Sequence, residues 1–251
     1  MRSERAEPDL SLVAEELVDQ LGGGVEASLV WANPLAGRTY RFETDAGTQF
    51  LKLSPKDVPA SHDVLVEAER LRWVDDRLPV PVVLETGSND VAHWMRTQGL
   101  PGVAASDQRW QSDPRATATS LGRAVRVFHD RLSSAVAGCP WSWRVADRLT
   151  ARPDSAQARV MAADAPEELD LVVGHGDLCA PNVLLTNEGS LAGYVDLGKL
   201  GVADRAADLG CGVWSLEFNH LGFAVNEFLA AYGLPVDRAA VQWYRDFYEA
   251  A

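Results

Sequence analysis

The sequence has no long apolar run, which excludes a membrane-spanning protein of the usual helical kind. No hydrophobic segment approaches the ~18–20 residues that cross a bilayer. The first residues, Met1-Arg2-Ser3-Glu4-Arg5, lead into acidic and amphipathic sequence instead of the short apolar stretch of a secretory signal peptide. We therefore expect a cytoplasmic protein that does not bind a membrane.

Cysteine is scarce and basic residues are outnumbered. Cys139, Cys179 and Cys211 are widely scattered without CxxC spacing, and their odd number argues against a disulfide framework, so we expect buried free thiols. With 23 Lys and Arg against 36 Asp and Glu, the net charge is −13. This charge disfavours nucleic acid as a partner and favours a small cationic substrate. The sequence does not indicate an oligomeric state.

Short strand-like runs separated by turns dominate the first hundred residues. They predict an antiparallel sheet with one helix inserted after its third strand, preceded by an amphipathic helix ending at Gly22-Gly23-Gly24. The expected elements are a helix over Leu10–Leu21, strands over Ala27–Ala32, Thr39–Glu43 and Thr48–Leu53, a helix over Asp63–Arg77, and strands over Val80–Leu84 and Ala92–Thr97.

From Pro114 onward the pattern is mainly helical, with a small hairpin near its middle. The expected elements are a helix over Ala116–Leu132, a buried strand over Leu171–Gly174, hairpin strands over Val183–Leu185 and Leu191–Val195, and helices over Ala203–Asn219, Gly222–Tyr232 and Asp237–Glu249. The chain is thus predicted to have a β-rich part followed by an α-rich part.

One constellation carries chemistry: His175-Gly176-Asp177, then Asn182, then Asp196 followed by Gly198. Phosphoryl transfer needs a carboxylate to orient the acceptor hydroxyl and take its proton, and hard oxygen ligands for Mg²⁺. Each residue taken alone could be an ordinary core histidine, turn residue or helix cap. Their joint spacing, HGD-x4-N followed by D-x-G, instead favours a phosphotransferase catalytic loop.

The segments His175–Asn182, Val195–Arg205 and Ala207–Leu209 resemble the core of the aminoglycoside phosphotransferases. The GVADR run at 201–205 and the closing 243–249 stretch resemble the 3'-phosphotransferase group in particular. The resemblance spans nearly the whole chain. It implies an α+β, protein-kinase-like bilobal fold, with a small antiparallel β N-lobe that has one inserted helix and a larger, mainly α-helical C-lobe. We expect a nucleotide-binding lobe over 1–98 and a catalytic and acceptor-binding lobe over 99–251.

The same resemblance implies roles for single residues. Asp177 is expected to be the catalytic base, and Asn182 and Asp196 are expected to hold Mg²⁺. Lys52 matches the lysine that contacts the nucleotide phosphates, and a lysine in an apolar strand is costly unless an anion meets it. Glu67 is the expected ion-pair partner of Lys52, with Glu69 as the alternative.

The nucleotide base and the acceptor have weaker candidates. Backbone groups of Thr97 and Gly99 are expected to bind the purine edge, and the turn over 33–38 occupies the place of the phosphate-positioning loop. Lys199, Glu217 and Glu249 are the candidate acceptor-binding residues. The Tyr248-Glu249-Ala250-Ala251 ending departs from the family pattern, in which two acidic residues precede an apolar and an aromatic residue, and this departure leaves the acceptor open.

The resulting hypothesis is a kinase that moves the γ-phosphate of ATP or GTP, with Mg²⁺, to an aminoglycoside hydroxyl, giving antibiotic resistance. His175 and Asp208 are expected to brace the loop and to take no part in the chemistry. Two alternatives stay open: a kinase for another small hydroxylated metabolite or antibiotic, and a catalytically inactive nucleotide-binding or scaffold protein.

Overall fold

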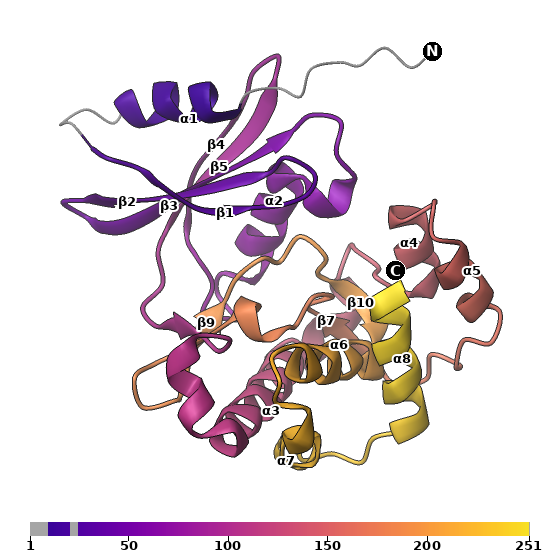
Figure 1. The fold of residues 1–251 in the computed structure, drawn as a ribbon. Coiled ribbons are helices and arrows are strands. Elements are labelled where there is room, and N and C mark those ends of the chain that lie inside the picture. Colours follow the sequence, from indigo (N-terminus) through magenta and orange to yellow (C-terminus); the bar gives the residue numbers. More distant parts are fainter. Residues whose placement is uncertain (1–9, 21–24, 251) are drawn as a thin grey trace. The chain divides into compact units, whose positions relative to one another are not determined.

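The computed structural model describes residues 10–20 and 25–250. They fall into two compact units, one reaching to Asp75 and including Pro81–Leu100, the other made of Asp76–Val80 and the chain from Pro101 onward (Figure 1). The short 76–80 stretch is tied to the second unit through its backbone. Arg131 Nη1 donates to Arg77 O (3.3 Å), and Tyr194 N donates to Pro79 O (3.0 Å).

The first unit is built on a five-stranded antiparallel sheet with strand order β1-β2-β3-β5-β4. Its elements are α1 (Leu10–Asp19), β1 (Ser28–Ala32), β2 (Arg38–Thr44), β3 (Gly47–Pro55), the 3₁₀ turn η1 (Ala60–His62), α2 (Val64–Val74), β4 (Val83–Ser88) and β5 (Ala92–Gln98). The inserted helix α2 follows the third strand, as predicted.

Because side chains alternate in direction along β3, the two faces of the sheet pack against different helices. Leu51 and Leu53 join a buried cluster with Leu10, Val13 and other apolar residues of α1. Lys52, which lies between them, extends to the opposite face and meets Glu67 of α2. The amphipathic α1 therefore covers one face of the sheet, and α2 covers the face that carries the lysine.

Several boundaries in this unit differ from the sequence expectation; for example, the helix expected over Asp63–Arg77 ends at Val74. β4 begins at Val83 instead of Val80, because Pro81 has no N–H to donate to a ladder and the segment becomes a strand only after it. The first helix ends at Asp19, while Leu21 and Gly22-Gly23-Gly24, its expected end, lie outside the described residues.

The second unit combines a helical core with short strand pairs. Its elements are β6 (Val103–Ala104), η2 (Gln108–Ser112), α3 (Pro114–Arg131), η3 (Ser133–Gly138), α4 (Val145–Ala151), α5 (Ala156–Ala162), β7 (Leu171–Gly174), η4 (Ala180–Asn182), β8 (Val183–Leu185), β9 (Leu191–Tyr194), β10 (Gly201–Asp204), α6 (Arg205–Phe218), η5 (Gly222–Ala224), α7 (Val225–Tyr232) and α8 (Arg238–Ala250). β8 and β9 form the predicted hairpin, and β7 pairs with β10.

The pairing of α6 with α8 depends on a glycine. A Cβ at Gly210 would lie 2.6 Å from the backbone nitrogen of Arg245, so only glycine allows the two helices to approach this closely. This approach brings the last turns of α8 beside α6. Within the described residues no helix is both long and apolar enough to span a bilayer.

The expected helix over Ala203–Asn219 was wrong at its start. Gly201–Asp204 forms β10, and the helix begins at Arg205 with Asp204 as its cap, whose side chain accepts the backbone N–H of Ala206 at 2.8 Å. A four-residue strand paired only to a distant partner leaves no periodic signal. The same holds for β6, and α4 and α5 are too short to show a clear apolar stripe.

Candidate active site

The catalytic-loop candidates follow β7 in the second unit, where the chain turns sharply at Gly176. Gly176 has a positive φ of 81°, and a Cβ there would lie 2.3 Å from Lys199 O. Only glycine satisfies both conditions. The turn ends strand β7 and presents the next side chain, Asp177, at the end of the β7–β10 pair.

His175 braces this turn, as expected. Its Nε2 lies 2.9 Å from Val195 O, and its Nδ1 lies 3.3 Å from Asp177 N. A carbonyl only accepts and an amide N–H only donates, so the ring is a neutral imidazole with its hydrogen on Nε2. Burial lowers the pKa of His175 and favours the same neutral form. His175 thus links the loop to the strand that precedes Asp196.

A buried carboxylate binds the backbone of the loop at His175 and Gly176. Asp208 of α6 is 2% exposed and accepts the backbone N–H groups of His175 (2.7 Å) and Gly176 (2.9 Å). Nε2 of His129 lies 3.1 Å from the same carboxylate. Burial would raise the pKa of Asp208, but the His129 contact and the loop amide lower it. The charged group therefore satisfies loop donors that would otherwise be buried without partners.

The carboxylate of Asp177 meets three side chains. Lys199 Nζ lies 2.8 Å from Oδ2, the Tyr248 hydroxyl donates to Oδ1, and Cys211 Sγ lies 4.0 Å from Oδ1. Burial would raise the pKa of Asp177, but the charge and hydrogen bond of Lys199, with the hydrogen bond from Tyr248, lower it to about 2. Asp177 is therefore ionised across the physiological pH range.

The thiols beside the loop are free. Cys179 and Cys211 are buried, as expected, whereas Cys139 is only partly buried. Burial raises the pKa of the Cys211 thiol well above its usual range, so it stays protonated beside the carboxylate.

Asn182 and Asp196, the candidate metal ligands, are held on facing segments. Asn182 is 6% exposed, its side-chain amide nitrogen donates to Asp177 O (2.9 Å), and its backbone carbonyl accepts the N–H of Val195 (3.0 Å). Asp196 is exposed and has a positive φ of 62°, a conformation that non-glycine residues rarely adopt. Such strain is typical of functional sites.

The donor chemistry of this pair suits Mg²⁺. Magnesium is usually bound by one or two protein oxygens together with substrate phosphates and water. Across residues 10–20 and 25–250, no three His, Cys, Asp or Glu side chains are grouped as a self-sufficient metal site. The side-chain amide of Asn182 and the carboxylate of Asp196 therefore fit a Mg²⁺ ion that is also bound by the phosphates of a nucleotide.

The lysine candidate of the first unit is paired as predicted. Lys52 Nζ lies 2.9 Å and 3.2 Å from the two carboxylate oxygens of Glu67, and the two side chains are 18% and 10% exposed. Glu69, the alternative partner, points to an exposed face of α2. The ion pair holds the ammonium group of Lys52 in place.

The remaining nucleotide candidates use backbone groups that are partly engaged. Gly99 N donates to Thr48 O (2.8 Å), and Thr97 is paired with Phe50 in the sheet. In the turn over 33–38, Asn33 Oδ1 accepts the N–H groups of Leu35 and Gly37, both at 2.9 Å. The amides of Leu35, Gly37 and Gly99 therefore have partners inside the first unit.

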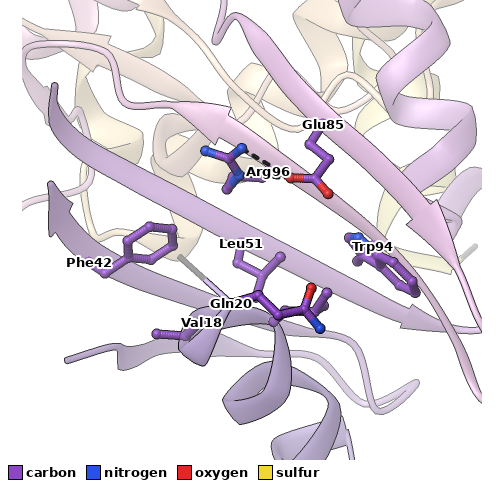
Figure 2. Close-up of a pocket in the computed structure, with 8 residues that line it drawn as sticks. Val18, Gln20, Phe42, Leu51, Glu85, Trp94 and Arg96 are labelled. Atoms are coloured by element: carbon purple, nitrogen blue, oxygen red, sulfur yellow. Dashed lines mark hydrogen bonds and ion pairs between the residues drawn. The ribbon is translucent and has the colours of Figure 1, made fainter. Parts of the chain in front are cut away.

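The first unit also contains a cavity of about 290 Å³ beneath α1, lined by Leu17, Val18, Gln20, Phe42, Leu51, Glu85, Trp94 and Arg96. Figure 2 shows Leu51 and Trp94 at its wall and the ion pair of Arg96 with Glu85 (3.0 Å) at its side. Because Leu51 lines it, the cavity lies on the sheet face opposite Lys52. It is therefore separate from the lysine candidate.

Two of the three acceptor candidates are brought together by an arginine that sequence reasoning missed. Nε of Arg245 lies 2.7 Å from Glu217, and its Nη1 contacts Glu249 and lies 3.1 Å from Asp246. Lys199, the third candidate, is bound to Asp177. Tyr248 was also missed as a neighbour of Asp177. The i, i+4 spacing of Arg245 and Glu249 was the only local signal for any of these contacts.

The fold and this site define a phosphotransferase of protein-kinase-like fold. The model of the family described as "Phosphotransferase enzyme family" matches residues 32–244. An aminoglycoside 3'-phosphotransferase of Streptomyces fradiae is 34% identical over 226 residues, covering 78% of this chain and 83% of the relative. The chain belongs to this phosphotransferase family, among its aminoglycoside phosphotransferases.

Solved structures agree with this assignment. The crystal structure of an aminoglycoside-3'-phosphotransferase of type VIII has a TM-score of 0.79 at 26% identity, covering 96% of this chain and 99% of the other. An aminoglycoside phosphotransferase of Streptomyces rimosus, solved with ADP and streptomycin, has a TM-score of 0.73 at 25% identity, covering 96% and 97%. The expected fold class is confirmed.

Proposed function

We propose that this chain transfers the γ-phosphate of ATP or GTP to a hydroxyl of an aminoglycoside, of the 3' type, and so confers resistance to that antibiotic. The observation that carries the proposal is the ionised carboxylate of Asp177, presented on a rigid turn and held by Lys199. The names of the relatives and the ADP complex of the S. rimosus enzyme support the choice of acceptor class and donor. A reaction that consumes a nucleoside triphosphate is in keeping with a cytoplasmic protein.

Asp177 is proposed to orient the acceptor hydroxyl and to take its proton. The acceptor oxygen forms a bond to the γ-phosphorus, the bond from that phosphorus to the β–γ bridging oxygen breaks, and a nucleoside diphosphate leaves. A carboxylate with a pKa of about 2 is a weak base. It suits a loose transition state, in which the hydroxyl proton is lost late and correct positioning matters more than basicity.

Asn182 and Asp196 would hold Mg²⁺, which when bound neutralises phosphate charge as the nucleotide reacts. Lys52, oriented by Glu67, is proposed to bind the nucleotide phosphates. Backbone groups at Thr97 and Gly99 remain the candidates for the purine edge. With these roles, the predicted lobe over 1–98 would bind the nucleotide, and the predicted lobe over 99–251 would carry the catalytic groups.

A phosphotransfer assay with a panel of acceptors tests the proposal. Purified protein with Mg²⁺ and ATP or GTP should release nucleoside diphosphate only when kanamycin, neomycin or streptomycin is present, and the position of the phosphate on the product gives the regiochemistry. Asp177→Asn should lower kcat by about 10²-fold or more, because it keeps the size of the side chain but removes the base. Unchanged turnover in Asp177→Asn contradicts the proposed mechanism.

A kinase for another small hydroxylated compound is the second candidate. It is favoured by one observation, the binding of both Glu217 and Glu249 by Arg245, which reduces the carboxylate surface offered to a polycation. Turnover with a neutral polyol or sugar, and none with any of the three aminoglycosides, would select it. Mg²⁺-dependent nucleotide binding without turnover on any acceptor would instead indicate an inactive scaffold.

A further inference from the structure

Three aromatic side chains of the second unit form a continuous row that ends at Asp177. Trp214 and Phe218, one turn apart on α6, stack with ring centroids 5.1 Å apart and planes 18° apart. The Trp214 ring also contacts Tyr248 of α8, with centroids 4.9 Å apart. The Tyr248 hydroxyl donates to Asp177 Oδ1. The row therefore runs from the surface of the unit to the proposed base.

The outer end of this row faces solvent. Phe218 is 68% exposed, while Trp214 and Tyr248 are partly buried. A single exposed phenylalanine needs no explanation, but here it extends a stack that is continuous with the reacting centre. Burial raises the pKa of Tyr248, so its hydroxyl stays protonated and can only donate to the carboxylate.

The carboxylates on α6 and α8 are less available to bind a cationic ligand than their number suggests. Arg245, whose side chain is 20% exposed, contacts Glu217 and Glu249 and also lies 3.1 Å from Asp246. One guanidinium shared among three carboxylates leaves the cluster negative, so it still attracts cations from a distance. One oxygen of each carboxylate, however, already has a fixed cationic partner.

Resting on the proposed function, we infer that Trp214, Phe218 and Tyr248 form the wall that binds the amino-sugar ring of the acceptor. We name these three residues the aromatic wall. Aromatic faces attract ammonium groups through the ring quadrupole. Their flat apolar surface also buries the C–H face of a sugar ring. Both features suit an amino sugar, which carries cations on an otherwise flat ring.

The wall also determines which hydroxyl reacts. Tyr248 contacts Asp177 Oδ1 directly, so a sugar ring packed along the wall places a hydroxyl beside that oxygen. The acceptor hydroxyl then takes the donor position that Tyr248 holds in this structure, or shares Oδ1 with it through the second lone pair. Recognition by stacking thus supplies the orientation that transfer needs.

The test uses Phe218→Ala, because this exposed side chain can be removed without opening the core. The KM for the best acceptor among kanamycin, neomycin and streptomycin should rise about 10-fold, while the KM for ATP changes less than about 2-fold. Phe218→Trp should restore the acceptor KM. Phe223→Ala is the matched control, since Phe223 is also exposed, at 63%, and should leave both constants unchanged.

Glu217→Gln distinguishes acceptor binding by the aromatic wall from acceptor binding by the carboxylates. The inference holds if Phe218→Ala raises the acceptor KM more than Glu217→Gln does, and it is overturned if Glu217→Gln has the larger effect or if Phe218→Ala behaves like Phe223→Ala. Calorimetric titration with neomycin measures binding without turnover. Binding that depends on Phe218 but produces no phosphorylated product contradicts the proposed function and supports the aromatic wall. The aromatic wall is overturned if the wild type does not bind neomycin, or if Phe218→Ala binds it as tightly as the wild type.

Discussion

The ammonium group of Lys199 lies 2.8 Å from Oδ2 of Asp177, and both side chains are largely buried, at 15% and 20% exposed. The pair is the main reason, with the hydrogen bond from Tyr248, that this largely buried carboxylate has a pKa of about 2 instead of one above its usual value. Its position therefore controls the pH range in which the proposed base is ionised.

Lys199→Met should move the acid limb of the kcat/KM profile to higher pH. Removal of the cation leaves burial as the largest influence, and burial raises the pKa of Asp177, so the limb should rise by about two pH units, from near pH 2 to near pH 4, where the variant loses about half its activity. Steady-state rates between pH 4 and 8 measure the shift. Lys56→Met, which removes an exposed lysine bound to Asn89 O, is the control; an unchanged limb in Lys199→Met contradicts the role of the ion pair.

The same pair links stability to pH. Because the pKa of Asp177 is lower in the folded chain than the ordinary value near 3.9, ionised Asp177 stabilises the fold above about pH 4, and this contribution disappears as the pH falls towards 2. It amounts to about 2 kcal/mol. Urea unfolding at pH 7 and pH 3 should show a smaller pH-dependent loss in Asp177→Asn than in the wild type; an equal loss contradicts the assignment.

Asp208→Asn should weaken both the fold and the reaction. The amide would place an NH₂ group against one of the three donors that the carboxylate now accepts, from His175, Gly176 and His129, at a cost of about 3 kcal/mol. A chain of this size should then lose on the order of 10 °C in Tm. Thermal unfolding and kcat are measured together. Asp130→Asn, at an exposed carboxylate, should change Tm by less than about 2 °C.

Lys52→Met should raise the KM for nucleotide and leave the acceptor KM nearly unchanged. Loss of a charge-assisted contact of about 1.5–3 kcal/mol corresponds to roughly a 10- to 100-fold fall in kcat/KM for nucleotide. Glu67→Gln should have a smaller effect of the same kind, because it only releases the lysine. Glu69→Gln, two residues along the same helix and exposed, is the matched control. Equal effects of the two glutamate variants would contradict the pairing observed at Lys52.

Gly176→Ala should disrupt the catalytic turn. The new Cβ would lie 2.3 Å from Lys199 O in a backbone conformation that alanine rarely adopts, which costs on the order of 3 kcal/mol. Denaturant unfolding gives the stability loss, and the displaced Lys199 backbone should lower kcat as well. Gly138→Ala, where no atom lies within 4 Å of the added methyl group, should be close to neutral. Similar stability of the two variants would show that the turn tolerates a side chain.

Much of the first unit could be predicted because its signals are local. Alternation along β3 and the turn residues around it indicate the strand, whereas the choice of Glu67 over Glu69 came from the family resemblance of the segment that follows. β4 was misplaced because apolar character was weighed above the missing N–H of Pro81. β10 was taken for a helix start because Asp204, a helix cap, also ends the strand.

Sequence alone indicated the roles proposed for Asp177, Asn182 and Asp196, since the spacing of a phosphotransferase loop is a property of contiguous chain. Only the tertiary structure decided what surrounds Asp177. Lys199 and Tyr248 are 22 and 71 residues away from it along the chain. The Tyr248 contact depends on how closely α6 and α8 pack at Gly210, a glycine that has no periodic signature. The surroundings of the proposed base are therefore a product of packing, while the proposed reacting groups are a product of the motif.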